Sequence, residues 1–192
     1  LVTTPMVYFA NYELGTMSGV MITGSHNPAE YNGLKMVVDD KTLTAELIQE
    51  LKIRIETNNL YSGSGKYSAF EIREIYLQKV LANITLHRKM KIAIDCGNGV
   101  AGDIAPELFQ RLGCDVVELY CDVDGNFPNH HPDPSDPKNL KVLQQTVLEH
   151  NADVGFAFDG DGDRLGIIDN TGKIIWPDRL LMLFAQELLG RN

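Results

Sequence analysis

The alternation of strand-like and helix-like segments in the second half of this chain constrains its fold more than any other feature. Apolar runs typical of buried strands cover three stretches, residues 91–95, 115–120 and 153–158. Two segments with helical periodicity separate them, residues 102–112 and 139–149. Strands that alternate with helices predict parallel pairing, right-handed crossovers and helices on both faces of the sheet. We therefore predict an α/β fold of mixed, mainly parallel sheets.

The remaining segments divide the chain into further parts. Strands are predicted at 18–23 and 33–38, helices at 43–58, 70–84 and 177–189, and a hairpin at 164–175. Residues 1–17 show no pattern that decides their structure. A linker-like stretch and a helix precede the alternating segments, which places a domain boundary near residues 85–90.

The predicted strand at 153–158 leads into Asp159-Gly160-Asp161-Gly162-Asp163-Arg164. Glycine at both intervening positions lets the backbone curl tightly, so the three carboxylates converge. Carboxylates this close repel one another unless a cation lies among them, and hard oxygen ligands suit Mg²⁺ or Ca²⁺. Ligands of doubly wound sheets bind at the carboxyl ends of strands, where this loop lies. The loop is thus a candidate metal site, with a solvated acidic turn as the alternative.

The spacing of the acidic loop excludes an EF-hand. That calcium loop also begins Asp-x-Asp-x-Asp, but it requires Gly at position 6 and Glu at position 12. Counted from Asp159, these positions hold Arg164 and Asn170. Three carboxylates followed by an arginine instead suit Mg²⁺ that holds a phosphate, because arginine binds phosphate oxygens in a fork.

A second candidate site is Thr23-Gly24-Ser25-His26-Asn27-Pro28, which also follows a predicted strand. A serine in a glycine-flanked turn beside a histidine is a possible nucleophile or phosphoryl carrier. Local features alone favour a turn whose Ser and Asn side chains satisfy their own backbone. Lys35 follows on the next predicted strand, where a single lysine most often faces solvent.

Two further motifs leave alternatives open. Residues 97–102 read Gly-Asn-Gly-Val-Ala-Gly between a strand and a helix, and Glu118 lies where a ribose-binding acid belongs, so a dinucleotide-binding oxidoreductase is the alternative function. A tight turn that needs glycine for packing explains the same pattern. His130 and His131 suggest a transition-metal site with Cys121 not far away, but a proline-stiffened loop is the simpler interpretation.

The charge balance limits the classes of partner. The chain has 26 acidic and 17 basic residues, a formal net charge of −9. Such a charge disfavours nucleic acid and anionic membrane surfaces. Its three cysteines contain no CxxC pair and their odd number argues against a disulfide framework. We therefore expect a reducing, cytoplasmic setting.

Several of these motifs together resemble the α-D-phosphohexomutase superfamily, and within it the bacterial phosphomannomutase/phosphoglucomutase members. The most specific are residues 18–28 (SGVMITGSHNP), 31–35 (YNGLK) and 159–164 (DGDGDR). Residues 94–102 (IDCGNGVAG) and 124–134 (DGNFPNHHPDP) are also similar to that family. The resemblance covers nearly the whole chain. It implies that residues 97–102 form a strand–helix turn instead of a nucleotide site.

The resemblance also implies a role for each matching residue. Ser25 would carry the transferable phosphoryl group and, as phosphoserine, would add an oxygen ligand to Mg²⁺ held by Asp159, Asp161 and Asp163. Lys35 would be a general acid/base. His26 would transfer protons or contact phosphate, and Arg164 would be an electrostatic partner of the phosphoryl group.

The implied activity is a Mg²⁺-dependent isomerase reaction. It interconverts hexose 1-phosphate and hexose 6-phosphate, with glucose or mannose as the sugar, through a phosphoserine and a bisphosphorylated sugar. Family members have four domains around one cleft. By this resemblance we predict three parts: residues 1–88 as the C-terminal part of domain 1, residues 89–175 as domain 2 and residues 176–192 as the first helix of domain 3. We expect these 192 residues to be inactive alone.

Overall fold

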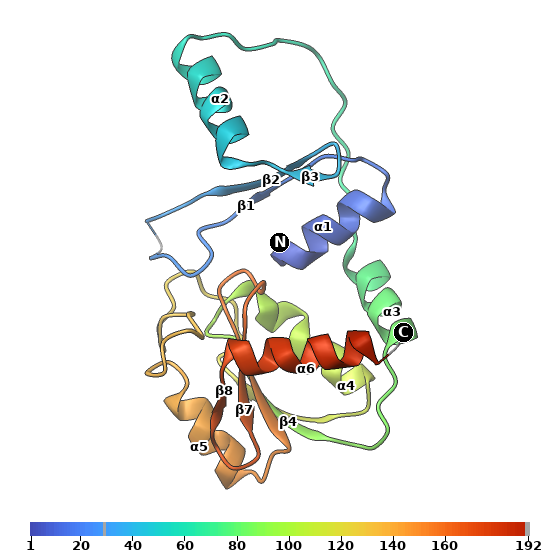
Figure 1. The fold of residues 1–192 in the computed structure, drawn as a ribbon, viewed down its shortest axis with the longest axis vertical. Coiled ribbons are helices and arrows are strands. Elements are labelled where there is room, and N and C mark those ends of the chain that lie inside the picture. Colours follow the sequence, from blue (N-terminus) through green and yellow to red (C-terminus); the bar gives the residue numbers. More distant parts are fainter. Residues whose placement is uncertain (29, 191–192) are drawn as a thin grey trace.

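The computed structural model describes residues 1–28 and 30–190, so only residues 191–192 of the predicted third part lie outside it. Figure 1 shows a three-stranded sheet at one end of the molecule and a larger sheet at the other, with helix α1 (Thr4–Glu13) between them. The larger sheet has the strand order β5-β4-β6-β7-β8. The chain therefore forms two sheet-based layers whose loops meet near the middle of the molecule.

Apolar strands build the five-stranded sheet, and their pairing is mixed. β4 (Lys91–Asp95) lies between β5 (Asp115–Leu119) and β6 (Val154–Phe158) and is parallel to both. β7 (Leu165–Asp169) pairs antiparallel with β6, and β8 (Ile174–Ile175) pairs antiparallel with β7. The predicted strands and hairpin of this region are confirmed. Parallel pairing is restricted to β4, β5 and β6.

Helices cover both faces of this sheet, as predicted. On one face α5 (Lys141–Glu149) buries Leu143 and Val147 against the sheet, and Gly155 leaves no room there for a side chain, since an added Cβ would lie 2.7 Å from Val147. On the other face α4 (Ala105–Arg111) packs on Ile92 and Ile94. The helix predicted at 102–112 is two pieces, because a 3₁₀ turn, η1 (Val100–Asp103), precedes α4.

The first sheet departs from the predicted pattern. β1 (Gly19–Ile22), β2 (Leu34–Val38) and β3 (Lys41–Thr42) pair only antiparallel, so the expectation of mainly parallel sheets is corrected here. Only residues 39–40 join β2 to β3, whereas parallel pairing needs a crossover of a dozen or more residues, usually with a helix. The connection from β1 to β2, residues 23–33, has no helix among its described residues. α2 (Ala45–Glu56) follows, starts at Thr44, whose side chain caps the Leu47 amide, and buries no residue.

Helix α3 (Arg73–Asn83) connects the two halves of the molecule. Its Leu77 is fully buried in a cluster with Met6 of α1 and Ile104, next to α4. The sequence left residues 1–17 undecided, and the structure makes them α1, with Pro5 in the first turn. α6 (Pro177–Leu189) ends the described chain with no buried side chain. None of the helices in residues 1–28 and 30–190 is long and apolar enough to cross a membrane.

Ion pairs between α3 and α4 add an acid-sensitive contribution to stability. Arg111 lies 2.8 Å from Glu74, and Arg73 lies 2.5 Å from Glu107. The hydrogen bond from Arg111, aided by one from Gln78, lowers the pKa of Glu74 to about 2. A carboxylate with a lowered pKa stabilises the fold above its ordinary pKa, and this contribution is lost as the pH falls through the folded value. The stabilisation by the Glu74 ion pair is therefore lost between about pH 4.5 and about pH 2.

We expect Glu74→Gln to lower the melting temperature at pH 6, where the wild type keeps the ion pair. This difference from wild type should shrink as the pH approaches 2, because the wild-type carboxylate then becomes protonated. Thermal unfolding by circular dichroism from pH 6 to pH 2.5 measures it. Glu50→Gln, on the exposed α2, is the control and should show a small difference that does not follow this window. A Glu74→Gln difference that is constant with pH would contradict the assignment.

Candidate active site

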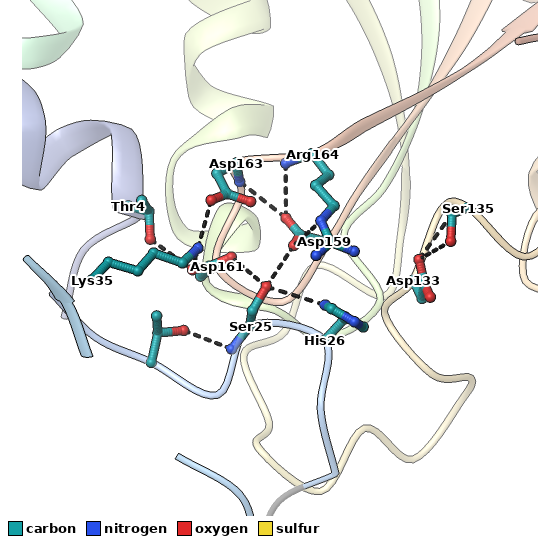
Figure 2. Close-up of polar contacts among 11 residues, drawn as sticks. Thr4, Ser25, His26, Lys35, Asp133, Ser135, Asp159, Asp161, Asp163 and Arg164 are labelled. Carbon is teal, nitrogen blue, oxygen red and sulfur yellow. Dashed lines mark hydrogen bonds and ion pairs between the residues drawn. The ribbon is translucent and has the colours of Figure 1, made fainter. Parts of the chain in front are cut away.

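Ser25 and the acidic loop lie in contact although 134 residues separate Ser25 from Asp159. The Ser25 hydroxyl oxygen lies 2.9 Å from a carboxylate oxygen of Asp159 and 3.0 Å from one of Asp161. Figure 2 shows the hydroxyl, on the turn after β1, pointing at both carboxylates, which lie on the loop after β6. The boundary between these two halves of the molecule is called the interface below. The structure thus joins the two candidate sites of the sequence into one.

The turn after β1 holds Ser25 in an unusual backbone conformation. Its φ of +53° lies in the left-handed region, which costs free energy for a residue other than glycine. The Ser25 amide donates to the Thr23 hydroxyl at 2.8 Å, and the Asn27 amide donates to the Gly24 carbonyl at 2.9 Å. A turn is therefore confirmed, but the side chain that bonds to its backbone is that of Thr23. The Ser25 hydroxyl instead points toward the acidic loop, so the expectation that the serine side chain satisfies its own backbone is wrong.

Backbone hydrogen bonds shape the acidic loop at the end of β6. One carboxylate oxygen of Asp159 accepts the amides of Asp163 and Arg164, each at 3.0 Å. Gly162 adopts a φ of +73°, and a Cβ at Gly160 would lie only 2.1 Å from the Ser25 carbonyl oxygen. Both glycines are therefore needed, one for the curl of the loop and the other for its contact with the serine turn.

The three acidic side chains of the loop converge. Asp159, Asp161 and Asp163 each offer an oxygen, and these atoms all lie within 4.8 Å of one another. Asp159 is fully buried and Asp161 is 2% exposed. Hard oxygens at this spacing, with the Ser25 hydroxyl beside them, fit a small divalent cation such as Mg²⁺. Within residues 1–28 and 30–190 this is the one group of three or more acidic, histidine or cysteine ligands arranged for a metal.

Lys35 reaches the acidic loop from β2. Its amino group lies 2.6 Å from Asp161 and 2.5 Å from Asp163. The expectation of a solvated strand lysine, drawn from local features, is therefore wrong, whereas the site role implied by the resemblance agrees with this position. Thr4 also donates to Asp161, at 2.7 Å, and the sequence analysis did not single it out. No local signal marks Thr4, since its contact depends on how α1 packs beside the loop.

The buried carboxylates and Lys35 shift one another's protonation. Burial raises the pKa of Asp159. Burial acts in the same direction on Asp161, but hydrogen bonds from Lys35 and Thr4 outweigh it, and its pKa is lowered. Desolvation acts to lower the pKa of Lys35, yet its bonds to Asp161 and Asp163 raise it overall. Lys35 is thus held as an ammonium ion that neutralises part of the negative charge.

His26 and Arg164 flank the serine and the carboxylates. The Nδ1 atom of His26 lies 3.3 Å from the Ser25 hydroxyl. The Nε atom of Arg164 lies 3.9 Å from Asp159, and 47% of the Arg164 side chain is exposed. Arg164 lines a cavity of about 390 Å³ together with Ser135 and Trp176. The guanidinium can therefore reach both the acidic loop and a ligand in this cavity.

The paired histidines do not form a metal site. His130 bonds to the carboxylate of Asp95 at 3.0 Å, whereas the ring of His131 lies 6.4 Å from the ring of His26. Cys121 lies 3.6 Å from the Cys96 sulfur instead of facing the histidines. The transition-metal interpretation is wrong, because each of these side chains faces a different partner. The stiffened loop that the sequence favoured is what the structure contains.

The glycines of residues 97–102 serve packing. A Cβ at Gly99 would lie 2.8 Å from the backbone of Gly160, and one at Gly102 would lie 2.0 Å from the Cys121 carbonyl oxygen. The Val100 amide donates to the Gly160 carbonyl at 3.0 Å. Protein backbone therefore occupies the space that a pyrophosphate would need against these glycines. The segment is a strand–helix turn, as the resemblance implied, and its bond to Gly160 shows that it also supports the acidic loop.

Comparison with known families agrees with this arrangement. The family model described as phosphoglucomutase/phosphomannomutase, alpha/beta/alpha domain I matches residues 1–62. The model described as phosphoglucomutase/phosphomannomutase, alpha/beta/alpha domain II matches residues 74–172. Together the two models cover the serine turn and the acidic loop.

Individual relatives are similar over the whole chain. A protein named phosphomannomutase/phosphoglucomutase from Pseudomonas aeruginosa is 56% identical over 192 residues, which is 100% of this chain and 42% of that protein. A phosphoglucomutase from Neisseria meningitidis is 52% identical over 195 residues, with the same shares of each chain. This chain therefore spans less than half the length of the curated relatives that it matches.

A solved structure has the same fold. The crystal structure of a phosphoglucomutase/phosphomannomutase family protein from Burkholderia thailandensis superimposes with a TM-score of 0.95 at 45% identity, covering 100% of this chain and 44% of that one. A putative phosphomannomutase from Thermus thermophilus shares the fold at a TM-score of 0.82 and 23% identity, covering 100% of this chain and 45% of that one. With two family models matched, high identity to named relatives and the same fold, the chain belongs to the phosphoglucomutase/phosphomannomutase family.

Proposed function

We propose that this chain is the catalytic part of a phosphohexomutase that interconverts hexose 1-phosphate and hexose 6-phosphate. The observation that carries the proposal is the placement of the Ser25 hydroxyl within 3.0 Å of two buried carboxylates from the other half of the molecule. A serine held beside carboxylates, a lysine and an arginine suits phosphoryl transfer, which depends on positioning and charge neutralisation. The family relationship supports the same conclusion.

Each residue then has a defined task. The phosphoryl group on Ser25 passes to a hydroxyl of the hexose monophosphate: the new O–P bond forms, the Ser25 O–P bond breaks, and the hydroxyl proton is replaced at the Ser25 oxygen, with Lys35 and His26 as the groups that exchange it. The bisphosphorylated sugar turns over in the site, and its other phosphate returns to Ser25. Lys35 is held protonated and donates a proton to the leaving oxygen, then accepts one in the opposite direction. His26 lies near enough to the Ser25 hydroxyl to share these proton transfers.

The acidic loop would hold the cofactor. Asp159, Asp161 and Asp163 present a set of hard oxygens that fits Mg²⁺, with an oxygen on Ser25 as a further ligand. Bound Mg²⁺ would supply positive charge that neutralises the transferring phosphoryl group. Arg164 can bind phosphate oxygens from the exposed side, at the mouth of the cavity that it lines with Trp176. The substrates proposed are glucose or mannose 1- and 6-phosphate and the hexose 1,6-bisphosphate.

The division into parts is proposed on the same basis. Residues 1–88 would form the C-terminal part of domain 1 with the phosphoserine turn, residues 89–175 domain 2 with the metal loop, and residues 176–192 the first helix of domain 3. The family matches at 1–62 and 74–172 support this order. A cytoplasmic location is likewise proposed, from composition alone. Because the relatives are more than twice as long, we expect the 192 residues alone to lack turnover.

The test compares the full-length protein containing this chain with its Asp161→Asn variant. We expect the wild type to convert glucose 1-phosphate or mannose 1-phosphate to the 6-phosphate when primed with the 1,6-bisphosphate, and to lose turnover in EDTA. Mg²⁺ should restore turnover. Asp161→Asn should lower kcat by about a hundredfold or more and weaken Mg²⁺ binding, since it removes one of the ligand charges.

The control for this test is Asp39→Asn, which changes an exposed acidic side chain in the turn between β2 and β3. It should keep both turnover and Mg²⁺ binding. Turnover that survives EDTA, or a wild type that isomerises neither sugar phosphate, would contradict the proposal. Fluorescence titration with NADH tests the alternative function, a dinucleotide-binding oxidoreductase. We expect no binding, because the glycines of 97–102 pack against protein backbone.

A further inference from the structure

We propose that Asp95 and His130 form a positioning pair that aligns the serine turn with the acidic loop. Asp95 is the last residue of β4, and His130 lies on the loop between β5 and α5. Neither side chain touches Ser25 or the three carboxylates, and none of the functions assigned above uses them. The expected effect of this pair on kcat rests on the proposed function. Its expected effect on the position of the serine turn rests on geometry alone.

Asp95 and His130 form an ion pair in which the carboxylate and both ring nitrogens have hydrogen-bond partners. Asp95 is fully buried, and its carboxylate oxygens lie 3.0 Å from the His130 Nε2 atom. The same carboxylate accepts the Gly97 amide at 2.9 Å. The other ring nitrogen of His130, Nδ1, lies 2.9 Å from the His131 carbonyl oxygen. Because both ring nitrogens face acceptors, both bonds form only when the imidazole carries two protons.

The electrostatics agree with a charged His130. The hydrogen bond that His130 donates to the Asp95 carboxylate raises the pKa of His130, against the opposing effect of partial burial. Loss of this partner would leave the buried Asp95 carboxylate without its counter-charge, and an unpaired buried charge destabilises a protein. His130 is thus fixed at both ring nitrogens, and its backbone is fixed with it.

Fixing His130 fixes the segment of residues 125–132 against the turn that follows β4. A Cβ at Gly97 would lie 3.2 Å from the His130 ring and 3.0 Å from Pro132, so the two backbones are in close contact. Asn129 donates to the side chain of Asn98 at 2.7 Å. This turn supports the acidic loop through the bond from Val100 to Gly160. The 125–132 segment and the acidic loop therefore both pack on the turn that follows β4.

The same segment reaches the serine turn. The ring of His131 lies edge-on to the ring of His26, with centroids 6.4 Å apart. Gly125 and Phe127 face Ser25 across a cavity of about 230 Å³, which Gly160 also lines. Pro132 lies 3.5 Å from the position of a Cβ on Gly160. A shift of the 125–132 segment would change the position of His26 and of the serine turn relative to the carboxylates.

The test uses the full-length protein with His130→Phe, which keeps a ring but removes both hydrogen-bond donors. We expect kcat to fall about 10- to 100-fold with little change in KM, because alignment in the transition state is lost and no substrate contact is removed. His130→Gln restores an N–H donor toward Asp95, and should recover most of the lost kcat. His150→Gln, at the exposed end of α5, is the control and should leave kcat unchanged.

Two further measurements separate positioning from general damage. In a double-mutant cycle, Asp95→Asn combined with His130→Phe should cost no more than the larger single change, because the two residues act as one unit. Hydrogen exchange should quicken at residues 23–27 and 125–132 in His130→Phe, and this readout does not depend on mutase activity. An inactive wild type would therefore refute the proposed function and leave the exchange result to decide the positioning.

The positioning pair would be overturned by an unchanged kcat in His130→Phe, by independent losses that multiply in the double variant, or by exchange at residues 23–27 that stays at the wild-type rate. If His130→Phe does not fold, the same exchange and kinetic comparison in Asp95→Asn and His130→Gln decides the question. A KM increase at constant kcat would also contradict the proposal, because it would place His130 in direct contact with substrate.

Discussion

Replacing Ser25 by alanine is expected to reduce hexose phosphate isomerisation by the full-length protein more than about a thousandfold. The hydroxyl is the atom that would carry the phosphoryl group, and no neighbouring side chain can take its place between Asp159 and Asp161. The loss should appear in kcat, measured by a coupled assay with the 1,6-bisphosphate present. Ser64→Ala, in the exposed linker, is the control and should retain wild-type turnover.

The fold should survive this change. Ser25 is partly exposed and lies in a turn that the bond from the Asn27 amide to the Gly24 carbonyl maintains. We therefore expect a melting temperature within a few degrees of wild type, which separates loss of the phosphoryl carrier from unfolding. A Ser25→Ala protein that keeps more than about a tenth of wild-type turnover would show that another group carries the phosphoryl group.

The second large effect is expected from Gly160→Ala. An added Cβ would lie 2.1 Å from the carbonyl oxygen of Ser25, a backbone atom that can move only if the serine turn or the acidic loop moves. A displacement of about 1 Å between reacting groups can cost about a hundredfold in rate. We expect kcat to fall by about that factor or more, although no carboxylate and no proton-transfer group is changed.

Gly63→Ala provides the matched control, because a Cβ there meets no atom within 4 Å. It should leave turnover and melting temperature close to wild type. For Gly160→Ala, Mg²⁺ titration and thermal unfolding show whether the acidic loop itself persists. Wild-type kcat in Gly160→Ala would mean that the close contact between the serine turn and the acidic loop is not needed for transfer.

The strands and helices of the five-stranded sheet could be predicted from the sequence, because burial sets the apolar pattern within each segment. Apolar runs such as 153–158 and helical periodicity at 139–149 are set by burial on the two faces of one sheet, and the structure confirms both. The acidic loop was also predicted from local pattern, because glycines between carboxylates let the three side chains converge. The antiparallel pairing of β1, β2 and β3 was not predicted, because the strand patterns at 18–23 and 33–38 do not state how neighbouring strands run.

The contacts across the interface could not be derived from local pattern. Lys35 looked like a solvated strand residue, and only the pairing of β1 with β2, beside the acidic loop, brings it to Asp161. Thr4 gave no signal, because α1 was undecided and its bond to Asp161 spans 157 residues. Resemblance to a family joined Ser25 to the acidic loop and placed Lys35 in the site, but the contacts of Lys35 with Asp161 and Asp163 come only from the structure.

The most direct test of the central claim is to locate the phosphoryl group. The full-length protein is incubated with hexose 1,6-bisphosphate and Mg²⁺, digested, and its phosphopeptides are mapped by mass spectrometry, with Ser25→Ala in parallel. We expect one phosphoryl group on the peptide that contains Ser25, located on that residue, and none in the variant. A phosphoryl group on another residue, or turnover by a wild type that never carries one on Ser25, would contradict the account.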